Sequence, residues 1–445
     1  MVLLMRGWNR KLLLISIPIG AENLFQALAT FIDQIVLSHL GAVAVAVAGL
    51  AGTTLLVANV ALTAISSANA AVIARSRSDD ERFPFMTTIL AGSLITLCVS
   101  ALFIPCVLTL AVAVFEKTTN DSYLIASLNQ YLSISVWSVP MLALSSVLRG
   151  GIRALGYTGA ASALGVCSVV FYTIFAIVLI YGFLGFPAMG ILGAPTSLLI
   201  ASCLRLLMMI SLLAVIRGEL KFVRSRFASV CRSILKLIFP LFAAECIWVG
   251  GLFGYGAIAS LGGSADIAAS QVAISIQNVI LAALSGLPVA AMLNLSQLEG
   301  YSHGQRIIYE SVTAKFALYV SMVMSLLIVP VIVFSDEIYS GVFNENRSLP
   351  AMIAICIPII FVGTYANVLG MGILIARGNT SIMLISDIAA TLAIGIPLAY
   401  ALAVFFDFGV VGVFWGRLVE EGIRSLVLTV GWKRLFRQDD IVRAG

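Results

Sequence analysis

The sequence is poor in charge, in histidine and in the motifs that enzymes use. Only 11% of its 445 residues are charged, against about 25% in soluble domains. Its two histidines, His39 and His303, lie far apart and form no metal motif. It has no phosphate-binding glycine loop, no zinc helix motif and no Walker-type sequence, and its serines, histidines and acids show no catalytic ordering. We therefore expect neither an enzyme nor a resident cofactor, and any energy must come from an ion gradient unless a partner supplies it.

The cysteines and the net charge exclude two further classes of function. The seven cysteines mostly lie inside apolar runs and have neither disulfide nor zinc-ligand spacing, so packing explains them. The net charge is +5, but the basic residues are spread through short loops and not gathered on one segment. We expect no metal site and no nucleic-acid partner.

The chain instead contains many long apolar runs. It is 61% hydrophobic with a mean hydropathy of +1.08, which is typical of an integral membrane protein. A spanning helix needs about 20 mainly apolar residues. Twelve runs meet this length: 12–38, 43–74, 86–115, 124–148, 160–183, 188–216, 234–261, 267–298, 313–335, 349–376, 382–406 and 410–432. The N-terminus has only a weak basic patch and no small-residue cleavage site, so we read the first run as a retained helix.

The loop charges orient these spans. With twelve spans both termini share a side, and 21 of the 26 lysines and arginines fall in the loops of that side. Only Lys117 and Arg347 fall on the other, and the arginines at 205, 417 and 424 lie within spans. Because cytoplasmic loops carry the basic excess, we expect both termini in the cytoplasm and the protein in the plasma membrane, the bacterial inner membrane.

The two halves of the chain repeat each other. "LLLISIPIGAEN" lies over "ILKLIFPLFAAEC", "IRALGYTG" over "LIARGNTS" and "FPAMG" over "FGVVG", all at an offset of 222 residues. The sequence therefore predicts an all-α polytopic membrane protein whose twelve transmembrane helices form two parallel six-helix repeats. The expected domains are an N-terminal lobe over 1–216, a cytoplasmic inter-lobe loop over 217–233 and a C-terminal lobe over 234–445. In parallel-repeat transporters the solute passes between the lobes.

The first span carries two carboxylates, Glu22 and Asp33. Eleven residues separate them, so they share one helix face about 16 Å apart, with Gln26 and Thr30 between them. A carboxylate at the membrane centre costs roughly 2.5–3.5 kcal/mol on insertion scales, a cost that water, a cation or protonation can offset. We interpret this stripe as an interior-facing site; a bond that only locks helices together is the alternative.

Other spans add polar positions. Glu245 in the first span of the second lobe aligns with Asn23, the neighbour of Glu22. We take Asp33, Glu22 and Glu245 as candidate ion-coupling residues. With Gln26 and Thr30, the candidate substrate cleft comprises Asn59, Thr63, Gln271, Ser275, Asn278, Tyr365 and Asn367. Singly such residues often only bond helices together, but as a set in paired helices they suggest a wetted cleft.

The last span contains four charges of its own. Arg417 is three and four residues from Glu420 and Glu421, and Arg424 repeats that spacing, so the group can neutralise itself within one helix. Asp387 in the preceding span is left ambiguous.

The order of these motifs resembles multidrug and toxic compound extrusion (MATE) transporters. "LLLISIPIGAENLFQALATFIDQIVLSHLGAVAVAVAGLA" resembles their first helix and its exit, "IAASQVAISIQNVILAALSGLPVAA" their eighth helix, and "RGGIRALGYT" and "ILIARGNT" the loops after their fourth and tenth helices. The resemblance covers nearly the whole chain and implies the MATE fold. It also implies that Asp33 is a coupling residue and that Glu245 matches a seventh-helix glutamate of one branch. The fifth span lacks the acid that family members often carry, and Ala366 and Asn367 stand where another branch has an aspartate.

The resemblance implies a secondary active antiporter that exports small cationic or amphipathic compounds in exchange for H⁺ or Na⁺ by alternating access. We expect it to act as a monomer among membrane lipids. A lipid-linked saccharide or lipid flippase of the same superfamily is the alternative, and its cleft should be lined with arginines. The interior acids of the first and seventh spans favour cation export instead. The repeat and the paired acids argue against a non-transporting scaffold or enzyme subunit.

Overall fold

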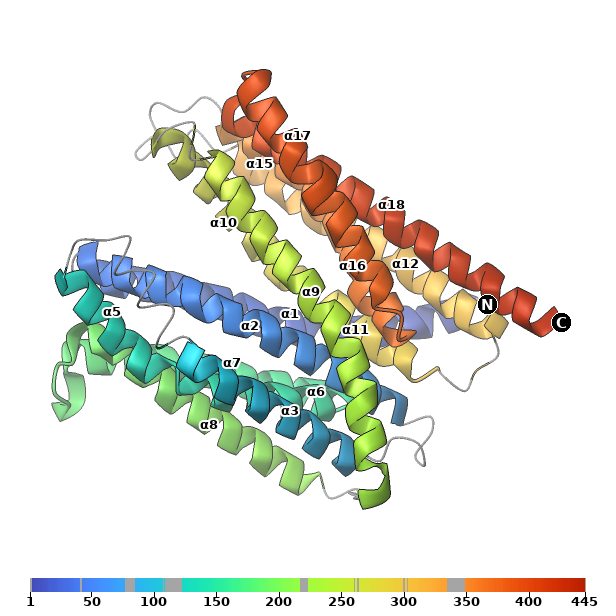
Figure 1. Cartoon of the computed structure of the whole chain (residues 1–445), viewed down its shortest axis with the longest axis horizontal. Helices are drawn as coiled ribbons and strands as arrows, with labels where there is room; N and C mark the ends of the chain where they lie inside the picture. The colour runs from blue at the N-terminus through green and yellow to red at the C-terminus, as the bar shows by residue number, and fades with distance from the viewer. Residues whose placement is uncertain are drawn as a thin grey trace. The chain divides into compact units, whose positions relative to one another are not determined.

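The computed structural model describes residues 2–40, 42–76, 85–106, 108, 122–216, 223–259, 261, 264–298, 301, 303–333 and 349–444, which are mostly helical and contain no strand. The first half contains α1 (Val2–Ser38), α2 (Ala42–Ser76), α3 (Phe85–Cys106), α5 (Ser122–Ser135), α6 (Ser138–Ala154), α7 (Thr158–Tyr181) and α8 (Gly193–Val215), with short 3₁₀ turns η2 (Phe183–Gly185) and η3 (Gly190–Leu192) between the last two (Figure 1).

The second half begins at the 3₁₀ turn η4 (Arg224–Arg226). Its helices are α9 (Phe227–Ala259), α10 (Ser264–Leu284), α11 (Gly286–Ser296), α12 (His303–Ser325), η6 (Leu326–Ile328), α13 (Val329–Val333), α15 (Leu349–Asn367), η7 (Val368–Leu374), α16 (Ser381–Asp387), η8 (Ile388–Gly395), α17 (Ile396–Tyr400), η9 (Ala401–Phe405) and α18 (Gly409–Ala444). Three of these segments, η7, η8 and η9, are π-helical.

Joined across their short breaks, these segments make twelve rods, which confirms the predicted all-α fold and its twelve spans. Within the described residues, ten helices are long and apolar enough by length and composition to cross a membrane. The rod formed by α18 is not one of them, because Arg417, Glu420, Glu421 and Arg424 interrupt its apolar surface. Large side chains such as Leu102, Val215 and Phe239 are mostly exposed, as lipid-facing residues are.

The chain forms two compact units. The N-terminal unit is Ala21–Ile238, and the C-terminal unit is Phe239–Gly445 together with Met1–Gly20. The chain therefore passes between the units inside α1 and inside α9. This division differs from the predicted lobes, which placed the first twenty residues in the N-terminal lobe and the change of lobe in the loop over 217–233. The part of that loop that the structure describes, from Val223 on, belongs to the N-terminal unit.

Close backbone packing explains why the start of α1 belongs to the C-terminal unit. A methyl group on Gly20 would lie 2.2 Å from the carbonyl oxygen of Ala283, and one on Gly286 would lie 2.0 Å from that of Ser16. These glycines let α1 lie directly against the junction of α10 and α11. Further along the same contact, the Trp8 indole donates a hydrogen bond to Thr313 Oγ1 at 2.9 Å.

The internal repeat is visible in the backbone of each unit. The turn after α6 is closed by hydrogen bonds from Leu155, Gly156 and Tyr157 to the carbonyls of Gly151, Arg153 and Ile152. The turn after η7 repeats all three bonds from Arg377, Gly378 and Asn379 to the carbonyls of Ile373, Ile375 and Leu374, each displaced by 222 residues. Both turns need a positive φ, 97° at Gly156 and 74° at Gly378, which glycine adopts at no steric cost.

Each unit has its own apolar core. In the N-terminal unit, residues of α1, α2, α5, α7 and α8 pack around Leu128 and Leu132. In the C-terminal unit, α10, α15 and α18 meet around Met352, Ile360 and Phe414. These apolar contacts hold the helices on which the buried charges lie.

Candidate functional site

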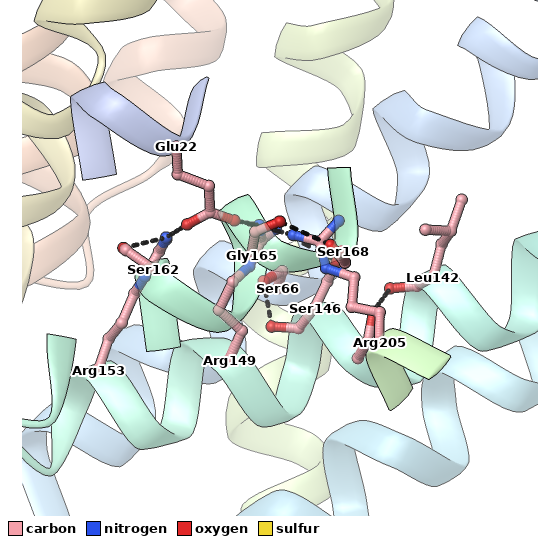
Figure 2. A network of polar contacts seen from close by, with 11 residues as sticks. Glu22, Ser66, Leu142, Ser146, Arg149, Arg153, Ser162, Gly165, Ser168 and Arg205 are labelled. Atoms are coloured by element: carbon pink, nitrogen blue, oxygen red, sulfur yellow. Dashed lines mark hydrogen bonds and ion pairs between the residues drawn. The ribbon is translucent and has the colours of Figure 1, made fainter. Parts of the chain in front are cut away.

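Glu22 is the centre of a buried charge cluster in the N-terminal unit. Its carboxylate, 1% exposed, accepts hydrogen bonds from Arg149 Nη1 at 2.5 Å, Arg205 Nη2 at 2.8 Å and Arg153 Nη2 (Figure 2). Arg153 Nη2 also donates to Ser162 Oγ at 3.2 Å. The cluster joins α1 to α6, α7 and α8. We call these four charged residues the arginine cluster.

The approach of Glu22 to α7 depends on a missing side chain. A methyl group on Gly165 would lie 2.3 Å from Glu22 Oε1 and 2.4 Å from its Cδ, closer than atoms that are not bonded can come. Glycine at this position therefore leaves the space in which the carboxylate meets the three guanidinium groups.

The arginine cluster changes how the sequence is interpreted. The positive-inside count assigned Arg149 and Arg153 to a loop, but both lie in the last turns of α6 and point at Glu22. Three cations around one carboxylate leave a formal charge of +2, so the interior of this unit is not acidic on balance. The sequence favoured cation export over a flippase because the interior charges of the first span are acidic. For Glu22 this premise is wrong, because three arginines surround it.

Asp33 lies on the same helix in a different setting. It is half-buried, and its Oδ2 accepts a hydrogen bond from the hydroxyl of Tyr172 on α7 at 2.5 Å. Within the part of the chain that the structure describes, no basic side chain pairs with it. Asp33 is therefore a carboxylate inside a membrane helix whose partner is a neutral hydroxyl.

The C-terminal unit contains a second charge cluster, centred on Glu420 of α18. Its carboxylate accepts hydrogen bonds from the Tyr255 hydroxyl of α9 at 2.6 Å and from Thr391 Oγ1 of η8. Arg417, one turn before it, donates to Gln277 Oε1 of α10 at 3.4 Å and lies over the Tyr255 ring at 6.0 Å.

Arg424 connects three more groups to this cluster. It pairs with Asp387 at the end of α16 at 2.8 Å, with Glu421 at 3.7 Å, and donates to Asn367 Oδ1 at 3.1 Å. Glu245 of α9 interacts electrostatically with both Arg424 and Asp387. The spacing of the α18 charges suggested that they neutralise one another within that helix. The structure shows instead that their main partners come from other helices. We call Glu245, Asp387, Arg417, Glu420, Glu421 and Arg424 the acidic cluster.

Local helix geometry positions the acidic cluster. Asn367 immediately precedes η7, and Asp387 immediately precedes η8, where Thr391 also lies. Single π-turns inside α-helices occur often at functional sites, since the extra residue reorients the side chains next to it. Nothing in the sequence pattern predicts these turns. With all groups ionised the acidic cluster has four carboxylates and two guanidiniums, a formal charge of −2.

Comparisons with known proteins agree with this architecture. The MatE family model matches residues 18–178. The chain is 21% identical over 452 residues to "Multidrug resistance protein NorM" of Photobacterium profundum, covering 98% of this chain and 97% of the relative. A solved structure described as MATE in the bent conformation has a TM-score of 0.86 and 17% identity, and the alignment covers 100% of this chain and 99% of that one. Residues 18–178 therefore resemble the MATE family, and the whole chain has the fold of solved MATE structures. It is a multi-pass membrane protein.

The share of the chain that is aligned differs among its relatives. "Protein DETOXIFICATION 31" of Arabidopsis thaliana is 26% identical over 178 residues, which are 37% of this chain and 31% of the plant protein. The shared region therefore spans about a third of that relative's length, whereas the bacterial match extends over nearly the whole of both chains.

The predicted ion-coupling and cleft residues are divided between the two units. Asp33, Glu22 and the exposed Gln26 lie in the N-terminal unit; Glu245, the exposed Asn278 and the half-buried Ser275 lie in the C-terminal unit. The side chains of Thr30, Asn59, Thr63 and Gln271 lie outside those that the structure describes. Among the described side chains of α10, the buried polar ones are Ser270 and Gln277, and Gln277 is next to the predicted Asn278.

Two predicted residues in the tenth rod have identified partners. Asn367 binds Arg424, and the Tyr365 hydroxyl lies 3.5 Å from Thr429 Oγ1 on α18. The first contact joins the predicted cleft to the acidic cluster. The resemblance did not predict Asp387, Glu420 or Tyr172 as site residues. Tyr172 lies on α7, which is the fifth span and contains no acid.

Another buried carboxylate, Glu310 of α12, has a structural explanation. It is 0% exposed and accepts hydrogen bonds from Arg306 at 3.2 Å, from Arg377 at 2.8 and 2.9 Å and from the Trp432 indole at 2.9 Å. These bonds join α12 to α18 and to the turn after η7, and they involve both carboxylate oxygens. These bonds stabilise the packing of the helices that carry them.

Proposed function

We propose that the protein is a secondary active antiporter that exports small cationic or amphipathic compounds in exchange for H⁺ or Na⁺. The observation that carries the proposal is the environment of Asp33, a half-buried carboxylate in a membrane helix with a tyrosine hydroxyl as its partner. Burial disfavours the charged form of a carboxylate unless a cation or proton compensates it. A group held in this way can bind and release a coupling ion as its access to water changes.

The acidic cluster supports a cationic solute. Its four carboxylates outnumber its two guanidiniums, and most of its members are buried or half-buried in the C-terminal unit. A positively charged solute near it would gain Coulomb attraction that water does not fully screen. "Multidrug resistance protein NorM" is the name of a relative that matches 98% of the chain, which agrees with efflux of small molecules. We place the protein in a bacterial inner membrane as a monomer with cytoplasmic termini and no resident cofactor.

Transport in proteoliposomes tests the proposal. Purified protein is reconstituted, a cationic dye is added, and either an H⁺ or a Na⁺ gradient is imposed alone. One of the two gradients should drive dye movement, and Asp33→Asn should abolish the driven component while leaving the protein inserted and folded. Full driven transport by a correctly inserted Asp33→Asn protein would show that another residue couples the ion.

A flippase for lipid-linked saccharides or lipids is the second candidate, and the arginine cluster favours it. Such lipids carry phosphate, which arginine binds through paired N–H donors. The same proteoliposomes distinguish the two functions when they contain a fluorescent lipid with a head group that a quencher can reach only in the outer leaflet. Protein-dependent lipid exchange without dye transport would replace the antiporter proposal.

A further inference from the structure

We propose that Arg149, Arg153 and Arg205 form a binding site for a dianionic phosphate group, of the phosphomonoester or free phosphate class. The site is separate from the acidic cluster and from Asp33, and the inference does not depend on cation antiport. It arises from the imbalance of charge and of hydrogen bonding around Glu22.

The charge imbalance sets the class of ligand. Three guanidiniums and one carboxylate leave +2, and arginine keeps its charge under physiological conditions. Asp33, the other acid of α1, is about 16 Å further along the helix, too far to neutralise the group. Arg149 and Arg153 lie near the C-terminal end of α6, whose dipole offers only about half a negative charge. A phosphomonoester, with a charge of about −1.5 to −2 at pH 7, would balance the site, whereas a carboxylate would not.

Unused donors indicate where the ligand would bind. Arg153 and Arg205 are 9% and 7% exposed, and the Nε–H of each is buried with no hydrogen-bond partner among the described residues. Leaving such a group without a partner is costly, and native proteins rarely do so. Glu22 accepts only one nitrogen from each arginine, so each planar fork retains further donors. The three oxygens of a phosphate group can accept them.

Arg149 is the most exposed arginine of the cluster. Its side chain is 21% exposed, against 9% for the other two arginines, so it is the member of the cluster that a ligand reaches first. Figure 2 shows the three arginines converging on Glu22 from two sides, which places Glu22 where a phosphate group would compete with it. The Glu310 site differs in charge, because only two arginines and a neutral indole donate to that carboxylate, which leaves a formal charge of +1.

Equilibrium binding of radiolabelled inorganic phosphate to the purified full-length protein tests the site, with ionic strength held constant. Wild-type protein should show saturable binding. Glu22→Gln removes the competing carboxylate and should tighten binding about tenfold, while Arg153→Gln and Arg205→Gln should each weaken it by about tenfold or more, the effect of one charge-assisted hydrogen bond. The opposite directions of the change in phosphate affinity decide the test. If the residues were only structural, all three variants would lose stability and their phosphate affinities would not differ in this way.

A matched control and a conservative variant keep the test decisive. Arg377→Gln removes an equally buried arginine from the Glu310 carboxylate and should leave phosphate affinity unchanged. If a glutamine variant does not fold, Arg205→Lys keeps the charge but removes the forked donors, and it should still weaken binding. Absence of saturable phosphate binding in the wild type, or binding that Glu22→Gln, Arg153→Gln and Arg205 variants leave unaltered, would overturn the proposal.

Competition distinguishes the source of the phosphate group. Glucose 6-phosphate serves as the soluble competitor, and nanodiscs containing phosphatidic acid present the same monoester on a lipid. Displacement by either supports the site and identifies a solute or a lipid head group as its occupant. Displacement by phosphatidylglycerol nanodiscs alone would overturn the monoester assignment, because that lipid carries a singly charged diester.

Discussion

Replacing Gly165 with alanine should destabilise the N-terminal unit through Glu22 alone. The new methyl group would lie 2.3 Å from Glu22 Oε1, whereas ordinary contact begins at 3.4 Å, so the carboxylate must retreat by at least 1.1 Å, the difference between the two. Oε1 is the oxygen that accepts from both Arg149 and Arg205, at 2.5 and 2.8 Å. A retreat of that size takes both bonds beyond normal hydrogen-bond length.

The magnitude follows from these two bonds. Each hydrogen bond to a charged group contributes about 1.5–3 kcal/mol, and alanine in a helix interior regains about 1 kcal/mol over glycine. The free energy of unfolding should therefore fall by about 2–5 kcal/mol. In a unit of this size the apparent melting temperature should fall by roughly 5–15 °C.

Gly159→Ala is the matched control for this prediction. Gly159 lies on the same helix, is exposed, and has nothing within 4 Å of the position its Cβ would take, so alanine there should be neutral or slightly stabilising. Thermal melting of the purified proteins, followed by size-exclusion chromatography with fluorescence detection, measures both variants. Equal melting temperatures for Gly165→Ala and Gly159→Ala would refute the packing argument.

Three further predictions concern the other buried carboxylates. Tyr172→Phe removes the hydrogen bond to Asp33 and should reduce gradient-driven transport about tenfold in proteoliposomes without lowering the melting temperature; unchanged transport would contradict a role for this bond. Glu245→Gln should weaken the binding of cationic dyes and spare neutral ones, and an equal loss for both would indicate a structural role. Glu310→Gln should lower the free energy of unfolding by about 3–5 kcal/mol, measured by thermal melting. Transport per folded molecule should stay intact, because the partners of Glu310 only hold helix ends together. Loss of transport at normal stability would disprove this.

Much of the fold could be predicted from the sequence because membrane helices are defined by local quantities. Span length, loop charge and the 222-residue offset each depend on short stretches of chain, and the twelve rods and the repeated glycine turns agree with them. The position at which a helix changes unit is not local. It depends on the close contact of Gly20 and Gly286 with distant backbone, which no periodicity reveals.

The candidate site was harder to predict for the same reason. Helical spacing placed Glu22 and Asp33 on one face but could not indicate that one would meet three arginines and the other a tyrosine. Arg149 and Arg153 were assigned to a loop because charge at the end of an apolar run is usually solvated. They are held inside the protein because α6 meets Glu22 of α1. The π-turns next to Asn367 and Asp387 likewise arise from packing.

The two places where the chain changes unit have a mechanical consequence. Both lie within helices, at Gly20 in α1 and at Phe239 in α9, and each is within two residues of a proline, Pro18 or Pro240. Proline removes one backbone hydrogen bond and makes a helix easiest to bend at that point. Both passages of the chain from one unit to the other therefore lie at points where the helix backbone bends at low cost. Glu22 follows the first of these points by two residues, so its three ion pairs fix the backbone of α1 directly beside a place where the helix can bend.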